Sequence, residues 1–292
     1  MELKFSKYHG TGNDFVLLED LDDERPLDRS VVAALCDRRF GVGADGVIRV
    51  VRGSDGADFF MDYRNADGSL AEMCGNGIRC LGKLVFERGI TAATELDVDT
   101  RGGARHLSLR VEGRVVREVT VGMGPPNFTK AAIPMRGPAW ETFVSESVDI
   151  GEGMTVKATA LSMGNPHLVL FVDDDPDRYH VGHIGPALEH HELFPEKTNV
   201  EFVQLQGDEL KARVWERGSG ETMACGTGAC AVLVAANEAG LVPTKAVVRF
   251  PGGPLTVERL EHDVLLTGPA EKVYDGVADP AWIANRKEAT SR

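Results

Sequence analysis

The chain has 292 residues, of which 42% are hydrophobic and 26% are charged, and its formal net charge is −13. This is the composition of a folded protein with room for two domains, not of a disordered chain. The acidic balance, with no basic run, excludes the electrostatic footprint of a nucleic-acid-binding protein. No apolar stretch approaches the length of a membrane span, and the N-terminus lacks the apolar segment of a signal peptide. We therefore expect a cytoplasmic protein whose five cysteines are reduced.

The first half of the chain predicts short strands and two helices. The expected strands cover residues 15–19, 46–51, 58–63, 96–100, 105–111 and 115–121, and the expected helices cover 29–38 and about 75–87. A crossing rich in proline and glycine runs from 122 to about 138 and is the best linker candidate. We therefore place a first domain at residues 1–122.

The second half repeats this order. Strands are expected at 155–161, 167–172, 200–205 and 209–215, with an irregular, histidine-rich region between the second and third of them. A helix at about 226–238 and three more strands follow, the last of them at 264–267. We place a second domain at 123–263, with a strand near 264–275 that could complete the first domain. Residues 279–292 are expected to form a loosely held tail.

A long internal repeat explains why the two halves are alike. Cys74-Gly75-Asn76-Gly77 opens one apolar segment, and Cys225-Gly226-Thr227-Gly228 opens another 151 positions later (225 − 74). Gly12-Asn13-Asp14-Phe15 resembles Gly164-Asn165-Pro166-His167 at an offset of 152. Two copies of so long a unit predict two similar domains, not a solenoid.

The two segments that follow the repeated cysteines predict buried helices. Residues 229–236 have no polar face, and residues 78–86 are apolar apart from Arg79 and Lys83. A helix that is hydrophobic all round must be buried on all sides. We therefore expect an α+β fold of two pseudo-symmetric domains, each a curved, mainly antiparallel sheet wrapped round a central helix. The N-termini of the helices, and the active site, are expected in the cleft between the domains.

Three other motifs do not carry a function. Gly41–Gly46 fits G-x-G-x-x-G but precedes a strand, whereas a dinucleotide site needs a following helix. Gly77–Leu84 is close to a P-loop but ends on Leu84 instead of a hydroxyl residue. The histidines at 180, 183, 190 and 191 lack the usual zinc ligand set, and a solvated loop is the better interpretation. We predict no metal site.

Cys74 and Cys225 are the strongest candidates for chemistry. One alternative is that both are small core residues, as we expect of Cys36, Cys80 and Cys230. Against it, each starts a helix, where free N–H groups and the helix dipole lower the pKa of a thiol. The glycines that follow let a carboxylate approach the same N–H groups.

Two thiols on opposite sides of one carbon can invert its configuration. One thiolate removes a proton from one face, and the opposite thiol delivers a proton to the other. The chain has no recognisable pyridoxal phosphate signature, so we expect no cofactor. The helix N–H groups would then stabilise the carbanion directly.

These motifs resemble those of the diaminopimelate epimerase family, which is cofactor-independent, and the resemblance covers nearly the whole chain. It is carried by His9–Phe15, Arg64–Ser69, Met73–Cys80, Met163–His167, Thr198–Phe202, Glu216–Thr222 and Ala224–Cys230. Together these motifs are highly specific, whereas a single Cys-Gly-x-Gly is not.

The resemblance implies interconversion of LL- and meso-2,6-diaminoheptanedioate, a small-molecule substrate, for the synthesis of lysine and peptidoglycan precursors. It implies that Cys74 and Cys225 are the acid/base pair and that Gly75-Asn76 and Gly226-Thr227 hold the carboxylate at the reacting carbon. The residues implied in binding the substrate, chiefly its distal end, are Asn13, Asn65, Asn165, Asn199, Glu216 and Arg217. His167 and Glu216 are candidates for tuning the thiols, because Phe15 and Asn65 stand at their places in the first half.

The resemblance also implies a homodimer. One departure is Gly46, where some family members carry a larger polar side chain. The nearest alternative activity is a related racemase or isomerase, of the proline racemase or phenazine-pathway type. A thiol redox or metal-binding protein is a further alternative, disfavoured because there is no C-x-x-C, and a non-catalytic ligand-binding module is another. Oxidation could join Cys74 to Cys225 if their Cα atoms lie within disulfide range.

Overall fold

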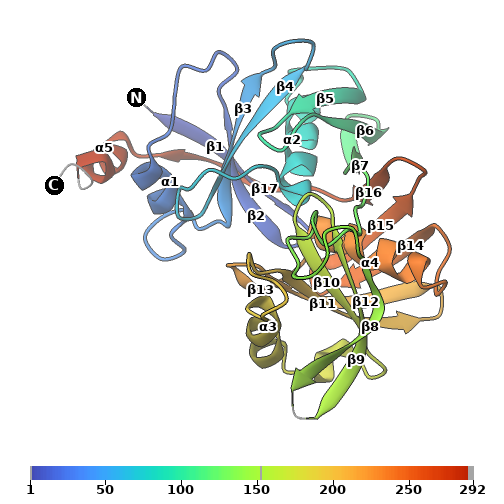
Figure 1. Cartoon of the computed structure of the whole chain (residues 1–292). Helices are drawn as coiled ribbons and strands as arrows, with labels where there is room; N and C mark the ends of the chain where they lie inside the picture. Colours follow the sequence, from blue (N-terminus) through green and yellow to red (C-terminus); the bar gives the residue numbers. More distant parts are fainter. Residues whose placement is uncertain (1, 152, 289–292) are drawn as a thin grey trace. The chain divides into compact units, whose positions relative to one another are not determined.

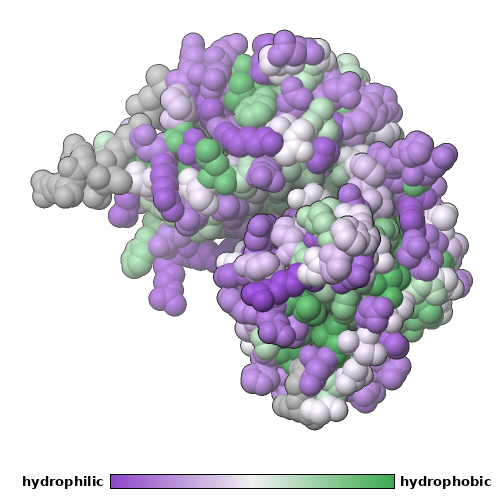
Figure 2. All heavy atoms as spheres, in the orientation of Figure 1, coloured by the Kyte–Doolittle hydropathy of each residue, from purple (hydrophilic) through white to green (hydrophobic). Residues whose placement is uncertain are grey.

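The computed structural model describes residues 2–151 and 153–288 and divides into two compact units (Figure 1). The first unit comprises Met1–Val121 and Gly268–Arg292, and the second comprises Gly122–Thr267. The face drawn in Figure 2 intersperses hydrophilic with hydrophobic side chains. Within the described residues, every helix is too short or too polar to cross a membrane.

The first unit is built on a mixed, mainly antiparallel run of strands. Its elements are β1 (Leu3–Gly10), β2 (Asn13–Glu19), α1 (Arg29–Cys36), β3 (Gly46–Arg52), β4 (Phe59–Asn65), α2 (Gly75–Glu87), β5 (Glu95–Asp99), β6 (Arg105–Glu112), β7 (Val115–Gly122), β17 (Glu271–Ala278) and α5 (Pro280–Glu288). Neighbouring strands follow the order β17-β1-β2-β3-β4-β5-β6-β7. The β2–β3 and β4–β5 pairs are parallel, and the other pairs are antiparallel.

The second unit repeats this topology. Its elements are β8 (Phe143–Gly151), β9 (Met154–Ser162), β10 (Pro166–Phe171), a short 3-10 helix (Pro176–Arg178), α3 (Val181–Glu189), β11 (Asn199–Gln206), β12 (Glu209–Glu216), β13 (Gly220–Thr222), α4 (Gly226–Glu238), β14 (Lys245–Phe250), β15 (Gly253–Arg259) and β16 (Val264–Gly268). Parallel pairs occur at β10–β11 and β12–β14. These two pairs are equivalent to the parallel pairs β2–β3 and β4–β5 of the first unit. The strand pairing therefore confirms the duplication predicted from the sequence.

One long helix lies at the centre of each unit. In α4, every residue from Gly226 to Ala236 is buried apart from Thr227, and the helix packs against strands β9 to β12, β14 and β15. In α2, every residue from Gly75 to Val85 is buried, and the helix contacts β1, β2, β3 and β6 (Figure 1). The predicted α+β fold, with its buried central helices, is confirmed.

The burial of α2 includes its two basic residues. Arg79 is fully buried, and its guanidinium donates to the carbonyl of Gly75 at 3.0 Å. Lys83 donates to Glu87 at 2.6 Å and to the carbonyl of Val116 at 2.7 Å. These bonds offset the cost of removing two charged groups from water.

The histidine-rich region, which the sequence predicted to be irregular, is partly helical. Residues 181–189 form α3, and Val181, Ile184 and Leu188 pack into the core of the second unit. Their spacing is that of one helix face, but the prolines on either side and Pro186 inside the segment obscured it.

The C-terminal segment also contains more regular structure than expected. Residues 280–288 form α5, whose Trp282 and Ile283 pack against the core cluster that includes Leu35. Asp279 accepts a hydrogen bond from the N–H of Ala281 at 2.7 Å, at the start of this helix. Residues 289–292 of the predicted tail lie outside the described residues. The region near 264–275 contains parts of two strands, β16 and β17, and β17 pairs with β1.

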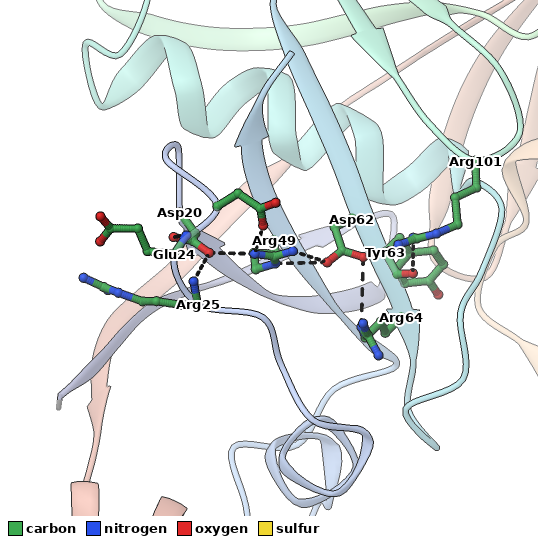
Figure 3. A network of polar contacts seen from close by, with 9 residues as sticks. Asp20, Glu24, Arg25, Arg49, Asp62, Tyr63, Arg64 and Arg101 are labelled. Carbon is green, nitrogen blue, oxygen red and sulfur yellow. Dashed lines mark hydrogen bonds and ion pairs between the residues drawn. The ribbon is translucent and has the colours of Figure 1, made fainter. Parts of the chain in front are cut away.

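A buried ion network crosses the first unit on strands β3 and β4 (Figure 3). Arg49 lies directly opposite Asp62 in the strand register, and their side chains are 2.9 Å apart. The same guanidinium lies 2.7 Å from Asp20, whose carboxylate also accepts N–H groups of the following loop. The network therefore joins two strands to the loop after β2.

The network also reaches the segment that leads to Cys74. Asp62 accepts a hydrogen bond from Arg101 at 2.6 Å. The next residue, Gly102, donates its N–H to the carbonyl of Glu72 at 3.0 Å. Glu72 precedes Cys74 by two positions, so these bonds help to fix the backbone from which Cys74 enters α2.

Candidate active site

Cys74 is the N-cap residue of α2. Its backbone is extended, with φ −140° and ψ 117°, and its Sγ accepts a hydrogen bond from the N–H of Gly77 at 3.5 Å. The side chain is half-buried. A helix begins here because the sulfur takes the position at which an N-cap side chain receives the first free N–H groups.

Two asparagines from the predicted set surround Cys74. The Sγ of Cys74 lies 3.6 Å from Oδ1 of Asn13, which also accepts a hydrogen bond from Asn76 at 3.2 Å. The amide of Asn13 is oriented in turn by Asp45, at 2.7 Å. Asp45 was not identified from the sequence, where a carboxylate in a glycine-rich loop gave no signal of its own. Its contact fixes which end of the Asn13 amide faces the thiol.

Asn65 and Gly46 lie at the end of the same sheet. The side chain of Asn65 is exposed and donates to Ser69 at 3.0 Å, within the turn after β4. A Cβ atom on Gly46 would lie 2.6 Å from the carbonyl oxygen of Arg64 and 2.6 Å from the ring of Tyr63. The Arg64 carbonyl and the Tyr63 ring therefore leave no space for a side chain at position 46.

Cys225 is the N-cap residue of α4 and repeats the backbone geometry of Cys74. Its φ and ψ are −120° and 124°, and its Sγ accepts from the N–H of Gly228 at 3.4 Å. Its Sγ also lies 3.4 Å from the hydroxyl of Thr227, which receives a hydrogen bond from Asn165 at 3.3 Å. Cys225 is only 5% exposed. The two cysteines thus share a backbone setting but differ in exposure.

A histidine and a glutamate are buried beside this group. Nε2 of His167 lies 3.0 Å from Oδ1 of Asn165, and Nδ1 lies 2.6 Å from Oε1 of Glu201. Both His167 and Glu201 are 0% exposed. Glu201 was not singled out from the sequence. The available signal was a carboxylate in the strand 199–206, between Val200 and Phe202, whose side chains pack into the core on the other face of the strand.

Glu216, the last residue of β12, lies close to Cys225. It accepts a hydrogen bond from the hydroxyl of Thr222, and a second hydrogen bond joins it to Cys225. Burial raises the pKa of Glu216 above its ordinary value, and these two hydrogen bonds only partly oppose that rise. The structure therefore brings together Asn165, His167, Glu216, Cys225 and Thr227.

The electrostatics of Cys225 differ from what its position at a helix start predicted. Burial raises the pKa of its thiol well above the ordinary value, and the Glu216 carboxyl raises it further. Contacts with the Thr227 hydroxyl and the Gly228 N–H lower it, but by less. The expectation of a lowered pKa is therefore wrong for Cys225, because desolvation outweighs the helix N-terminus.

Asn199 and Arg217 lie close together at the ends of β11 and β12. The amide of Asn199 donates to the carbonyl of Pro166 and accepts from the N–H of Arg217, both at 2.8 Å. Asn199 is only 3% exposed, whereas the side chain of Arg217 is exposed. One buried amide thus fixes the backbone that presents an exposed guanidinium.

The family is settled by comparison with known proteins. The family model described as diaminopimelate epimerase matches residues 5–129 and 159–273. The chain belongs to the diaminopimelate epimerase family. It is 44% identical to the diaminopimelate epimerase of Acetivibrio thermocellus, covering 95% of this chain and 99% of that protein. It is 46% identical to that of Bacteroides thetaiotaomicron, covering 94% and 97%.

The fold extends beyond this family. A solved structure of a hydroxyproline epimerase from Agrobacterium vitis matches with a TM-score of 0.70 at 15% sequence identity, covering 97% of this chain and 94% of that one. At such low identity the likeness concerns the fold alone. It supports the duplicated α+β architecture described above.

Proposed function

We propose that the chain epimerises LL-2,6-diaminoheptanedioate to the meso form without a cofactor, with Cys74 and Cys225 as the acid/base pair. The observation that carries this proposal is that both cysteines cap the N-termini of buried helices with the same backbone geometry. This occurs in a chain of the diaminopimelate epimerase family. The proposal includes a role in the synthesis of lysine and peptidoglycan precursors.

The proposed step moves two protons and no other atoms. A thiolate takes the hydrogen from the α-carbon, which leaves a carbanion and a thiol. The opposite thiol gives its proton to the other face of the carbon and becomes the thiolate. We assign Cys225 the role of the protonated partner, because burial raises the pKa of its thiol. For that direction of the reaction we assign the role of base to Cys74, whose side chain is half-buried.

The negative charge that develops on the substrate needs donors already in place. Backbone N–H groups at the start of an α-helix have no acceptor within the helix and can bind a carboxylate. We assign Gly75-Asn76 and Gly226-Thr227 to this role. Donors fixed by a buried helix need little reorganisation during the reaction, which is how such groups lower a barrier.

We assign the distal amino-acid end of the substrate to the polar side chains of the predicted binding set. An exposed guanidinium such as that of Arg217 offers a planar fork that matches a carboxylate. The amides of Asn13, Asn65, Asn165 and Asn199 can both donate and accept, which suits a zwitterion. We assign Glu216 to substrate binding and, together with His167, to the tuning of the Cys225 pKa.

Hydrogen exchange tests this function directly. The protein is incubated in D2O with the LL isomer and no added cofactor, and the product is examined for the meso form with deuterium at one α-carbon. Proline is run in parallel. Absence of exchange into diaminoheptanedioate would overturn the proposal, and exchange into proline alone would favour a proline racemase-like activity.

We further propose that the chain acts in the cytoplasm as a homodimer. Support for the dimer comes from β17, along which Val273, Tyr274 and Val277 are exposed to 56%, 42% and 56%. Exposed apolar side chains gathered on one strand are typical of an interaction surface. Sedimentation velocity of the wild-type chain and of Val273→Lys checks this, with a dimer expected for the first and a monomer for the second.

A further inference from the structure

The two units differ in what lies beneath their cysteine-capped helices. A Cβ atom on Gly77, three residues after Cys74, would meet Ile48 at 2.6 Å and Phe15 at 3.5 Å. A Cβ on Gly228, three residues after Cys225, would meet Oε1 of Glu201 at 2.9 Å. The same position of the fold is therefore apolar in the first unit and carries a carboxylate in the second.

The strand register shows that these are equivalent positions. In the parallel pair β2–β3, Phe15 lies opposite Gly46 and Leu17 lies opposite Ile48. In the parallel pair β10–β11, His167 lies opposite Asn199 and Val169 lies opposite Glu201. Phe15 and Ile48 are thus replaced in the second unit by His167 and Glu201, an imidazole and a carboxylate in hydrogen-bond contact.

Burying a glutamate in this position costs folding free energy, which suggests that the residue has a function. Glu201 is 0% exposed, and burial raises the pKa of its carboxyl, while the contact with His167 opposes that rise. Within the described residues its second oxygen, Oε2, has no hydrogen-bond partner. An apolar residue, as in the first unit, would avoid this cost.

The contacts of Glu201 lead step by step to the sulfur of Cys225. Glu201 holds Nδ1 of His167, and Nε2 of the same ring faces Asn165. Asn165 then directs its amide nitrogen to Thr227, whose hydroxyl lies 3.4 Å from the Cys225 sulfur. Both nitrogens of the ring face oxygen atoms, so a ring that carries two protons can donate in both directions.

We infer that Glu201 is a positioning residue for the Cys225 half of the active site. Its carboxylate fixes the ring of His167, and the ring fixes which end of the Asn165 amide faces Thr227 and, through it, the thiol. The inference rests on the proposed function for its kinetic consequence, but the hydrogen-bond chain itself can be tested without substrate. Glu201 does not touch the thiol and is not a catalytic residue.

The charges that act on this group come from three strands and one helix. Glu201 lies on β11, His167 on β10, Glu216 at the end of β12 and Cys225 at the start of α4. Both carboxyl groups raise the pKa of Cys225. Replacing Glu201 with a neutral side chain of the same size should therefore make Cys225 easier to ionise while loosening His167.

The first experiment examines the ring by NMR of protein with 15N-labelled histidine. An Nδ1–H proton held 2.6 Å from a buried carboxylate should resonate far downfield and exchange slowly. We expect this signal in the wild type, and its loss in His167→Gln assigns it to His167. In Glu201→Gln the signal should disappear or move upfield. Glu189→Gln is the matched control, because Glu189 is also a buried carboxylate of the second unit, bonded to Trp215 and Gly218 instead.

The second experiment follows alkylation of both thiols by iodoacetamide as a function of pH, with peptide mass spectrometry. In Glu201→Gln the alkylation profile of Cys225 should move to lower pH. The profile of Cys74 in the same molecules should not move, which makes it an internal control. Neither experiment depends on the identity of the substrate.

The third experiment is steady-state kinetics with the LL isomer. The free energy lost with one hydrogen bond to a charged group corresponds to roughly a tenfold to hundredfold change in a rate or equilibrium constant. We expect kcat to fall by that amount in Glu201→Gln and by more in Glu201→Ile, with KM little changed in both. The larger loss in Glu201→Ile distinguishes a hydrogen-bonding role from simple filling of space. If Glu201 only filled space, isoleucine would be tolerated there, since Ile48 occupies the equivalent position in the first unit.

Three outcomes would overturn the inference. These are a wild-type spectrum without the downfield His167 signal, an unchanged Cys225 profile in Glu201→Gln, and an unchanged kcat in that variant. If the wild type itself does not turn over diaminoheptanedioate, the proposed function fails. The NMR and alkylation results then still decide whether Glu201 positions the ring.

Discussion

Phe15 and His167 occupy equivalent positions in the two units. Each lies on the strand that leads away from a Gly-Asn pair, opposite the first residue of a parallel neighbour, Gly46 for Phe15 and Asn199 for His167. Both side chains are 0% exposed. Phe15 packs edge-on against Tyr63 at 5.9 Å, whereas His167 bonds to two oxygen atoms. The duplication gives two similar helix N-termini. The difference between Phe15 and His167 gives them different polar surroundings.

Replacing either cysteine tests whether two thiols are required. We expect Cys74→Ala and Cys225→Ala each to lower kcat by at least about a hundredfold, since loss of acid/base catalysis costs on the order of 10² to 10⁴. Circular dichroism and thermal unfolding should stay close to wild type. Cys230→Ala is the control, because Cys230 is buried in the middle of α4. Turnover near the wild-type level in either active-site variant would contradict the mechanism.

The order in which the two cysteines are alkylated tests the difference in their surroundings. Cys74 is half-buried, and Cys225 is 5% exposed with a pKa well above its ordinary value. Because the thiolate is the reactive form, we expect iodoacetamide at neutral pH to modify Cys74 first. Peptide mapping at short times measures this. Equal rates at the two positions would contradict it.

The fold could be predicted from the sequence because its signals are local and repeated. The Cys-Gly-x-Gly segments and the apolar run 229–236 predicted both central helices. Helix α3 was missed because Pro186 lies inside it, and α5 was missed because its packing on Leu35 is a contact between distant parts of the chain. Such contacts leave no periodic signal in the sequence.

The site was predictable in its parts but not in its electrostatics. The paired motifs identified Asn13, Asn165, Cys74 and Cys225 as candidates. The rise in the Cys225 pKa could not be predicted, because it depends on burial and on the approach of Glu216. Glu201 was missed for the same reason, since only the register of β10 and β11 places it beside His167.

Arg217 tests the proposed binding of the distal carboxylate. Lysine keeps the charge but loses the planar pair of donors, so we expect Arg217→Lys to raise KM about tenfold with kcat little changed. Arg178→Lys is a control of the same chemistry on an exposed residue of the second unit. Steady-state kinetics with the LL isomer measures both. A fall in kcat at unchanged KM would place Arg217 in the chemical step instead.

Gly46 tests the close packing at the end of β3. The added methyl group of Gly46→Ala would lie 2.6 Å from a backbone carbonyl oxygen, and we expect a loss of about 1–3 kcal/mol in the free energy of unfolding. Gly182→Ala is the control, because a Cβ there meets nothing within 4 Å. That change, inside α3, should be neutral or slightly stabilising. Urea denaturation compares the two, and an unchanged midpoint for Gly46→Ala would contradict the geometry.

The ion network in Figure 3 predicts how stability depends on pH. Burial alone would raise the pKa of Asp62, but hydrogen bonds from Arg101 and Arg49 outweigh it and hold the pKa below its ordinary value. A carboxyl with a lower pKa in the folded state binds fewer protons there than in the unfolded chain, so its contribution is complete above about pH 4. This contribution is lost as the pH falls through the folded-state pKa.

Asp62→Asn removes one partner of a buried network. We expect a loss of about 3–5 kcal/mol at pH 7, because Arg49 is left with less compensation for its buried charge. We also expect a weaker dependence of stability on pH below about 4, where the wild type loses the same interaction. Urea denaturation from pH 3 to 7 measures both effects, with the exposed Asp208→Asn as control. A parallel shift of the Asp62→Asn curve at every pH would contradict the assignment of acid sensitivity to this network.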